Sequence, residues 1–448
     1  MKRRTRAHEM IRHNATIYLL AALGIIVAMV SLTPQTRALT VTRVNVIDVV
    51  NGRILADSTV TLSGQTIASV IPNGVPPANA EVVAGQGKFL IPGLWDMHAH
   101  MEASGESWLQ LYVANGVTGI RDMGSGLDLI LKMREATSSG RVLGPRIFAA
   151  GPILDDAPGD WPFRMRVKTA EDGRTAVQLL KRRGVDLIKV HDHTPRDAFL
   201  AIADEAQRQN LPLAGHVPMG ITVDEVIAAG QRDIEHLDNL ELWKPCSGGE
   251  DYSPAKCRPF FEMLAHRGIW QTPTLAAMSE LATIGTPASA VSADHLAFAG
   301  KSLKAMWAGN QSLFATPEVA RSLRAAAEVG AVVTKDMATA GVPVLAGCDS
   351  MIAGFCVHDE LIAMVGGGMT ALAALQTATL NPARYFGLDT AGGVAPGQRA
   401  DLVLLDANPL TDIGNVRRIR AVVVAGRLLD RKKLDTLLAQ VKLAVKQQ

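Results

Sequence analysis

The chain has 448 residues, of which 48% are hydrophobic and 4% aromatic, and its formal net charge is +2. This length and apolar content favour a globular protein with one large domain and a smaller one, which needs no disulfide framework to fold. Residues 1–38 contain six Lys or Arg and one Glu, so the rest of the chain has a formal charge of −3 and nucleic acid is not an expected partner.

The first 38 residues have the layout of an export signal. Five basic residues precede an uncharged stretch, "IYLLAALGIIVAMVSL", at 17–32, which is short for a membrane-spanning helix. The "TRA" at 36–38 predicts cleavage after Ala38. The alternative is an uncleaved anchor, and only then would the protein associate with a membrane. In both cases we expect an exported protein, periplasmic or secreted.

Two distant parts of the chain have the sequence pattern of short β-strands. Such runs with turn residues between them occupy 40–71, and similar runs return at 400–409 and 419–429. Because chain ends often lie close together, we predict that 39–90 and 387–448 form one small β-sandwich. Residues 91–386 would then be a single insertion.

Within this insertion, strand-like runs alternate with amphipathic helical segments such as 195–210 and 223–231. Strand and helix in regular alternation predict a closed (β/α)₈ barrel, a TIM barrel, and the long segment 275–330 predicts additional helices near its mouth. We expect eight barrel strands, within 88–100, 116–124, 145–151, 185–191, 211–217, 232–237, 268–275 and 342–350.

Polar side chains mark the ends of several predicted strands. Chemistry in such a barrel occurs at the carboxyl ends of the strands. His98 and His100 are two apart, so both point to one face and can bind one metal ion. By themselves they are better explained as two hydrogen-bonded loop residues. The convergence at one barrel end favours a metal site, with these candidates: His98, His100, Lys189, His216, His236 and Asp349.

Lys189 lies in the apolar run "VDLIKVH", where a charged ammonium would be costly. A buried lysine with a lowered pKa is a nucleophilic amine that can take up CO₂ to form a carbamate, an anionic ligand for two metal ions. The alternative is an ion pair with Asp186 or Asp192.

Other residues have weaker signals. His191 and His193 follow Lys189 closely and are candidates for substrate contact or for support of the ligands, although loop histidines explain them equally well. Cys246 and Cys257 bracket a polar loop, and either a disulfide or two free thiols fits the sequence.

The motifs "PGLWDMHAH", "LIKV", "GHV", "IEHLD" and "AGCDS" resemble those of the amidohydrolase superfamily, in particular its imidazolonepropionase-like and Xaa-Pro dipeptidase-like branch. The resemblance extends over nearly the whole chain after residue 38. It implies that His98 and His100 bind a first divalent metal ion and that His216 and His236 bind a second. Carboxylated Lys189 would bridge the two ions.

Asp349 would ligate the first metal and transfer a proton. Cys348 departs from the family pattern, since Thr is common there, and so does His191, where an aromatic residue is frequent. These departures leave the ligands intact but put the substrate in doubt.

The resemblance implies a hydrolase with two divalent ions, for which zinc fits the imidazole and carboxylate ligands best. We expect a small substrate with an amide-type C–N bond, such as a dipeptide or an N-acyl amino acid. Arg164 and Arg166 are candidates to bind its carboxylate, although each taken singly is better explained as a solvated loop arginine. The alternatives are a lactone or phosphoester hydrolase and a non-catalytic scaffold. Relatives of this kind are commonly homo-oligomers.

Overall fold

The computed structural model describes residues 37–447 except 102–104, 160–162, 238–245, 247–251, 285–291, 315 and 351. The predicted export signal lies almost wholly outside the described residues and stays a prediction. Within the described part of the chain, no helix has both the length and the apolar character needed to cross a membrane.

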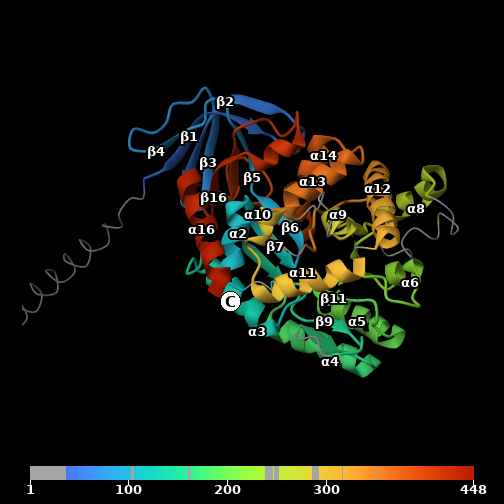
Figure 1. Ribbon diagram of the computed structural model, residues 1–448. Helices are drawn as coiled ribbons and strands as arrows, with labels where there is room; N and C mark the ends of the chain where they lie inside the picture. Colours follow the sequence, from blue (N-terminus) through green and yellow to red (C-terminus); the bar gives the residue numbers. More distant parts are fainter. Residues whose placement is uncertain are drawn as a thin grey trace, which may run out of the picture.

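The two ends of the chain pair in one sheet, whereas the sandwich predicted for them stays a prediction. In Figure 1 the first strands and the last strands lie side by side. The junction is antiparallel, with Leu402 opposite Pro92. The strands run in the order β17 (Arg427–Asp430), β16 (Ile419–Val424), β15 (Leu402–Leu405), β5 (Phe89–Pro92), β1 (Leu39–Ile47), β2 (Ile54–Ser63) and β3 (Thr66–Pro72), and β4 (Glu81–Ala84) pairs with β1.

The parallel strands of the insertion form two sheets. The smaller has β6 (Leu94–Ala99), β7 (Val117–Asp122) and β8 (Arg146–Ala149). The larger has, in spatial order, β10 (Arg164–Arg166), β9 (Ile153–Asp155), β11 (Ile188–Val190), β12 (Leu213–Gly215), β13 (Asp233–Glu235) and β14 (Trp270–Thr272).

Seven of the eight predicted strands therefore appear, and the short strands β9 and β10 were not expected. The predicted eighth strand, 342–350, has a single parallel bridge between Gln271 and Val344 instead of a ladder. The backbone groups of this segment form individual hydrogen bonds. Met97 N–H donates to Ala346 O and Leu345 N–H donates to Gln271 O, both at 2.9 Å. Asp186 N–H donates to Ala149 O at 2.8 Å, which connects β8 of the smaller sheet to the chain just before β11 of the larger one.

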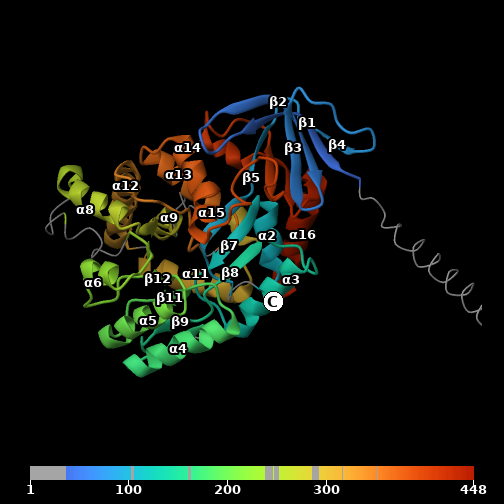
Figure 2. The same cartoon turned by 180° about the vertical axis from the view of Figure 1, so that it is seen from behind.

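Helices cover the outside of the parallel strands (Figure 2). The spacing of apolar residues predicted these helices. Helix α5 agrees with the predicted 195–210 and buries Phe199 and Ile202. The extra helices predicted within 275–330 are confirmed. The helices are α2 (Ser107–Ala114), α3 (Leu127–Ser138), α4 (Ala170–Arg183), α5 (Arg196–Arg208), α6 (Val223–Ala228), α8 (Pro254–His266), α9 (Leu275–Thr283), α10 (Ala293–Leu296), α11 (Lys301–Phe314), α12 (Pro317–Thr339), α13 (Cys356–Gly366), α14 (Ala371–Thr377), α15 (Leu380–Phe386), α16 (Arg431–Gln447) and the 3₁₀ helix η2 (Ile413–Arg417).

All four cysteines form disulfides. Cys246 bonds to Cys257, so of the two possibilities for this pair the structure has the bridge. Cys348 bonds to Cys356, a pair that the sequence did not suggest.

Candidate metal centre

One cavity of about 170 Å³ is lined by all six predicted metal ligands. They come from the ends of different strands: β6 supplies His98, His100 directly follows β6, β11 supplies the lysine, and the segments after β12 and β13 supply one histidine each. The aspartate follows the 342–347 segment. The structure therefore brings together these residues, which are far apart in the chain: His98, His100, Lys189, His216, His236 and Asp349.

Each of the four histidines has its Nδ1 atom occupied by an oxygen partner. The distances are 2.6 Å from His98 to Glu235 Oε2 and 2.7 Å from His216 to Asp192 Oδ1. His236 lies 2.7 Å from Thr274 Oγ1, and His100 lies 3.0 Å from Gly124 O. An imidazole whose Nδ1 carries the proton has its lone pair on Nε2, the arrangement found in metal-binding histidines.

Asp349 faces the Nε2 atoms of three of these rings. Its Oδ1 is 3.3 Å from His100 Nε2 and 3.8 Å from His98 Nε2, and its Oδ2 is 3.8 Å from His236 Nε2. Burial alone would raise the pKa of Asp349, but the neighbouring His98 and His100 hold it well below its usual value. The carboxylate is therefore ionised at neutral pH.

Burial also sets the charge of the imidazoles. It lowers the pKa of His98, His216 and His236 well below the usual value, and the nearby Lys189 acts in the same direction. Three of the four rings are thus neutral at pH 7, which is the form that binds metals. For His100 the hydrogen bond and charge of Asp349 outweigh burial and raise the pKa.

Lys189 is the unpartnered group of the site. Its side chain is 1% exposed, and its Nζ has no hydrogen-bond partner among the described residues. The two carboxylates considered as partners are engaged elsewhere, Asp186 with Arg134 and Asp192 with His216. Burial lowers the pKa of the Lys189 amine, partly offset by Glu235 and Asp349.

Three residues of the site have left-handed backbone conformations, which cost free energy for any residue except glycine. The φ angles are 67° at His236, 51° at Thr274 and 50° at Asp349. Hydrogen bonds from His236 N–H to Thr272 O and from Asp349 N–H to His98 O, both 2.8 Å, hold two of them. The fold thus maintains strained backbone where it turns side chains into the cavity.

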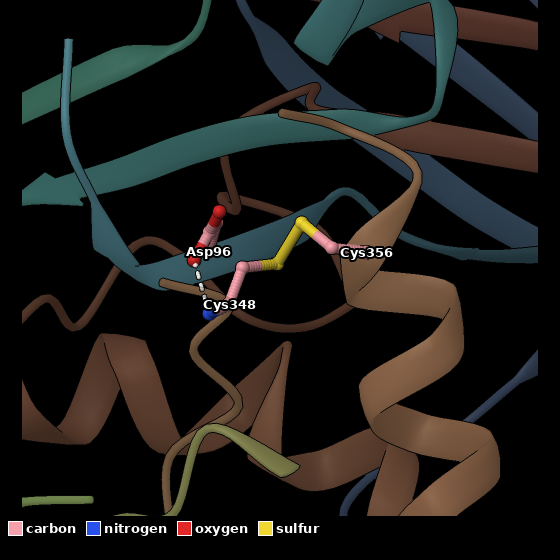
Figure 3. A group of neighbouring side chains, drawn as sticks. All are labelled: Asp96, Cys348 and Cys356. Atoms are coloured by element: carbon pink, nitrogen blue, oxygen red, sulfur yellow. Dashed lines mark hydrogen bonds between the residues drawn. A yellow bond between two sulfur atoms is a disulfide. The ribbon is translucent and has the colours of Figure 1, made fainter. Parts of the chain in front are cut away.

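Asp96 and a disulfide fasten the segment that carries Asp349 (Figure 3). The buried Oδ1 of Asp96 accepts bonds from His98 N–H and Cys348 N–H, both at 3.0 Å. Cys348 is in turn bonded to Cys356, the first residue of α13. The Cys that replaces the more usual Thr therefore attaches the Asp349 segment to a helix.

The four predicted substrate residues lie in different places. His191 lines the cavity, with its ring centroid 3.9 Å from that of His216. His193 is exposed, and neither it nor the two arginines is among the cavity residues. Arg164 pairs with Asp155 at 3.4 Å, and Arg166 pairs with Asp156 at 3.0 Å. The role of these residues in substrate binding stays a prediction.

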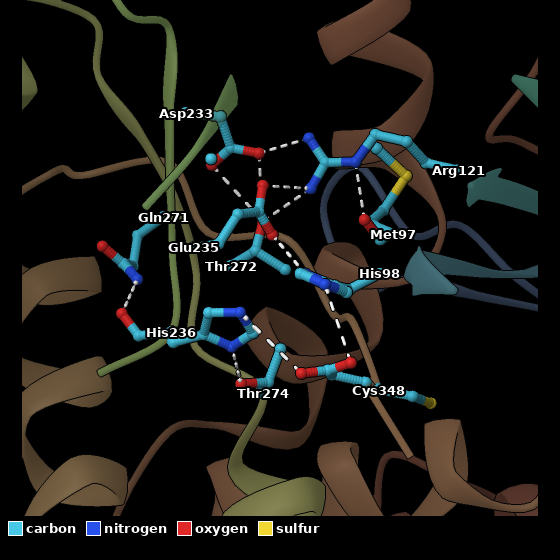
Figure 4. A network of polar contacts seen from close by, with 12 residues as sticks. Met97, His98, Arg121, Asp233, Glu235, His236, Gln271, Thr272, Thr274 and Cys348 are labelled. Carbon is cyan, nitrogen blue, oxygen red and sulfur yellow. Dashed lines mark hydrogen bonds and ion pairs between the residues drawn. The ribbon is translucent and has the colours of Figure 1, made fainter. Parts of the chain in front are cut away.

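A charged network beside His98 was not predicted (Figure 4). Arg121 on β7 is fully buried and contacts Asp233 and Glu235, both on β13. A signal for it exists in the sequence, because Asp233 and Glu235 are two apart on a buried strand and so share a face.

The donor set fits a metal ion. Ligand atoms of His98, His100 and Asp349 lie within 4.8 Å of one another, and those of His191, Asp192 and His216 form a second such group. Imidazole and carboxylate donors suit divalent transition metals. The buried Lys189 Nζ also fits, since it lines the same cavity and has no hydrogen-bond partner among the described residues.

These observations describe an α/β protein in which side chains that can bind a metal ion gather at the ends of parallel strands. The chain belongs to the amidohydrolase family, whose model matches residues 89–429. This confirms the resemblance proposed from the motifs.

Individual relatives agree with this membership. Ochratoxinase of Aspergillus niger is 25% identical over 401 residues, which covers 74% of this chain and 73% of that protein. The solved structure of bottromycin amidohydrolase has a TM-score of 0.74 at 24% identity and covers 92% of this chain and 91% of its own. A putative prolidase from Bifidobacterium longum has a TM-score of 0.68 at 23% identity, with 91% of this chain and 100% of its own covered. These two structures share the fold.

Proposed function

We propose that the protein is a metal-dependent amidohydrolase that cleaves an amide-type C–N bond in a small substrate. The observation that carries the proposal is the single cavity lined by four imidazoles, one carboxylate and one unpartnered amine, in which three of the imidazoles have Nε2 near the carboxylate. Divalent ions held by these residues, with zinc the best fit, would polarise the substrate carbonyl and lower the pKa of water towards neutrality.

Asp349 would act as the proton carrier of the reaction. Its carboxylate is ionised, half-buried and adjacent to three imidazoles, so it can accept the proton of the attacking water. It would then donate this proton to the departing amine, which completes hydrolysis without a net change in the aspartate.

Lys189 would be carboxylated. Its neutral amine forms an N–C bond with CO₂ and releases one proton, which leaves an anionic carbamate in place of an unpaired buried cation. This removes the cost of burying an ammonium without a partner. The carbamate would add an anionic oxygen ligand to the cavity that the four histidines line.

Apolar side chains in the cavity indicate which kind of substrate fits. Ala277, Met278 and Leu281 on α9, together with Ile153, also line the cavity. We therefore propose a dipeptide or an N-acyl amino acid that places an apolar group against α9, because burying such a group gains about 25 cal/mol per Å². The ochratoxinase and prolidase names of the relatives support an amide substrate of this kind.

We further propose that the two parallel sheets belong to one (β/α)₈ barrel and that the terminal sheet closes into a sandwich-like unit. The first part is supported by the backbone bond from Asp186, before β11, to Ala149 of β8 and by the bond from Met97 of β6 to Ala346. The second is supported by the bridge between Thr66 and Arg399, which brings β3 back to the chain before β15. Export is supported by the pairing of all four cysteines, since disulfides persist mainly outside the cytoplasm.

The experiment is elemental analysis of the purified protein with a hydrolysis screen. The wild type is compared with Lys189→Ala and with Lys181→Ala, an exposed lysine on α4 that serves as a control. We expect about two divalent ions per chain in the wild type and in the control. Lys189→Ala should lose metal and at least 100-fold in kcat/KM, about 2.7 kcal/mol of transition-state stabilisation.

The screen contains apolar dipeptides, N-acyl amino acids, a lactone and a phosphotriester. Cleavage of the lactone or phosphotriester alone would refute the amide assignment and keep the metal centre. Absence of metal after reconstitution with zinc and bicarbonate would refute the hydrolase itself and leave a scaffold.

A further inference from the structure

Arg121 is a buried cation with four hydrogen bonds. Its Nε donates to Met97 O at 2.6 Å, and its Nη1 donates to Asp233 Oδ2. Its Nη2 donates to Glu235 Oε1 at 2.7 Å and to Thr272 Oγ1 at 3.1 Å. The guanidinium therefore connects strands β6, β7, β13 and β14 next to His98 (Figure 4).

Glu235 connects this cation to a predicted metal ligand. One carboxylate oxygen accepts from Arg121, and the other lies 2.6 Å from His98 Nδ1. Both side chains are at most 1% exposed, so water cannot replace either contact. Because a carboxylate paired with a guanidinium only accepts hydrogen bonds, the proton of this contact belongs to His98 Nδ1.

Arg121 therefore holds His98 at two points. It fixes the carbonyl of the preceding residue, Met97, and through Glu235 it fixes the ring. A guanidinium suits this task better than an ammonium, since its donors have a rigid planar arrangement.

The other three histidines are held differently. His100 and His236 bond to a neutral carbonyl or hydroxyl oxygen, and the Asp192 that contacts His216 is 38% exposed. Among the described ligands, only His98 depends on a carboxylate that is itself fixed by a buried arginine. The network thus acts on one specific ligand and not on the site in general.

We propose that Arg121 and Glu235 are positioning residues that set the tautomer and orientation of His98, and thereby the metal affinity of its side of the centre. The inference rests on the proposed metal site. It requires that the apo-protein already has His98 protonated at Nδ1, with Nε2 presented to the cavity.

The first test compares Glu235→Gln with wild type in metal affinity, measured by competition with a chelating dye. The amide has the same shape but accepts with only one of its two ends, so either the Arg121 or the His98 contact is lost. We expect affinity for the first zinc ion to fall 10- to 100-fold. Asp186→Asn is the matched control, because it breaks the Arg134–Asp186 pair away from the histidines, and its affinity should remain within threefold.

Urea unfolding of each variant separates positioning from loss of structure. If Glu235→Gln and Asp186→Asn lose similar stability but only the first loses zinc affinity, the network acts through His98. Equal zinc affinity in Glu235→Gln and wild type would overturn the inference. Absence of zinc binding by the wild type would instead refute the proposed metal centre.

A measurement on the wild type keeps the inference testable if Glu235→Gln does not fold. ¹⁵N NMR of histidine side chains in the apo-protein, with the His98 signal identified from His98→Gln, reports which ring nitrogen carries the proton. Protonation at Nδ1 is expected, and protonation at Nε2 alone would overturn the proposal.

Discussion

His358 on α13 is a buried histidine outside the metal centre. Its Nε2 lies 2.9 Å from Asn115 O and donates to it, and burial lowers its pKa to about 4. Because this folded-state pKa lies below the unfolded value of about 6.5, the stability contributed by neutral His358 is present above pH 6.5 and is lost as the pH falls towards 4.

We predict that this single group makes unfolding about 2–3 kcal/mol easier at pH 4.5 than at pH 7. His358→Gln keeps a donor and cannot titrate, so it should lose less stability over the same range. Urea unfolding at the two pH values measures the difference. Burial raises the pKa of Asp233 and of Glu360 to about 8 in both proteins, which acts in the opposite direction, so only the difference between variant and wild type is diagnostic. Identical pH dependence in both would refute the assignment.

At the scale of elements, Gly119 determines how β6 and β7 pack. Gly119 is paired with Trp95 across the two strands, and a Cβ atom there would lie 2.3 Å from Trp95 Cδ2. We predict that Gly119→Ala lowers the free energy of unfolding by about 1–3 kcal/mol, because the indole has to move within a filled core.

The control is Gly309→Ala on α11, where no atom lies within 4 Å of the added methyl and helix propensity predicts a gain of up to about 1 kcal/mol. Urea midpoints compare the two, and a Gly119→Ala protein as stable as wild type would contradict this packing.

At the scale of the whole molecule, the C-terminal helix covers the insertion. Helix α16 packs against α2, and its Leu434, Val441 and Val445 are buried. Both views show it alongside α2, which follows the first strand of the insertion (Figures 1 and 2). The last residues of the chain thus stabilise a part of the fold that begins more than 300 residues earlier.

Removal of residues 431–448 should therefore destabilise the protein by about 4 kcal/mol or more, since three buried aliphatic side chains contribute roughly 1.5–3 kcal/mol each. Leu443→Ala provides the control, because this leucine of α16 is 61% exposed and its loss should cost less than about 0.5 kcal/mol. Thermal unfolding of both proteins tests the prediction. A truncated protein with an unchanged midpoint would mean that α16 contributes nothing to the fold.

Strand ends explain why much of the site could be predicted. An HxH pair, a lysine in an apolar run and an aspartate after an apolar segment are local patterns, and parallel strands bring their carboxyl ends together without further information. The pairing of the two chain ends could be predicted because both ends have the sequence pattern of short β-strands. The prediction of a full strand at 342–350 was wrong. The backbone groups of this segment form single hydrogen bonds, among them bonds to β6 and β14, and no continuous ladder.

The sequence by itself therefore determined the family, the alternation of strands and helices, and which six residues converge in one cavity, because each depends on patterns within a short window. Only the tertiary structure decided which oxygen holds each imidazole, that Lys189 is left without a partner, and that Cys348 bonds to Cys356. The same holds for the Arg121–Glu235–His98 chain, whose members are 114 and 137 residues apart. Hydrogen bonds at this separation depend on the exact placement of strands, and no local pattern encodes that placement.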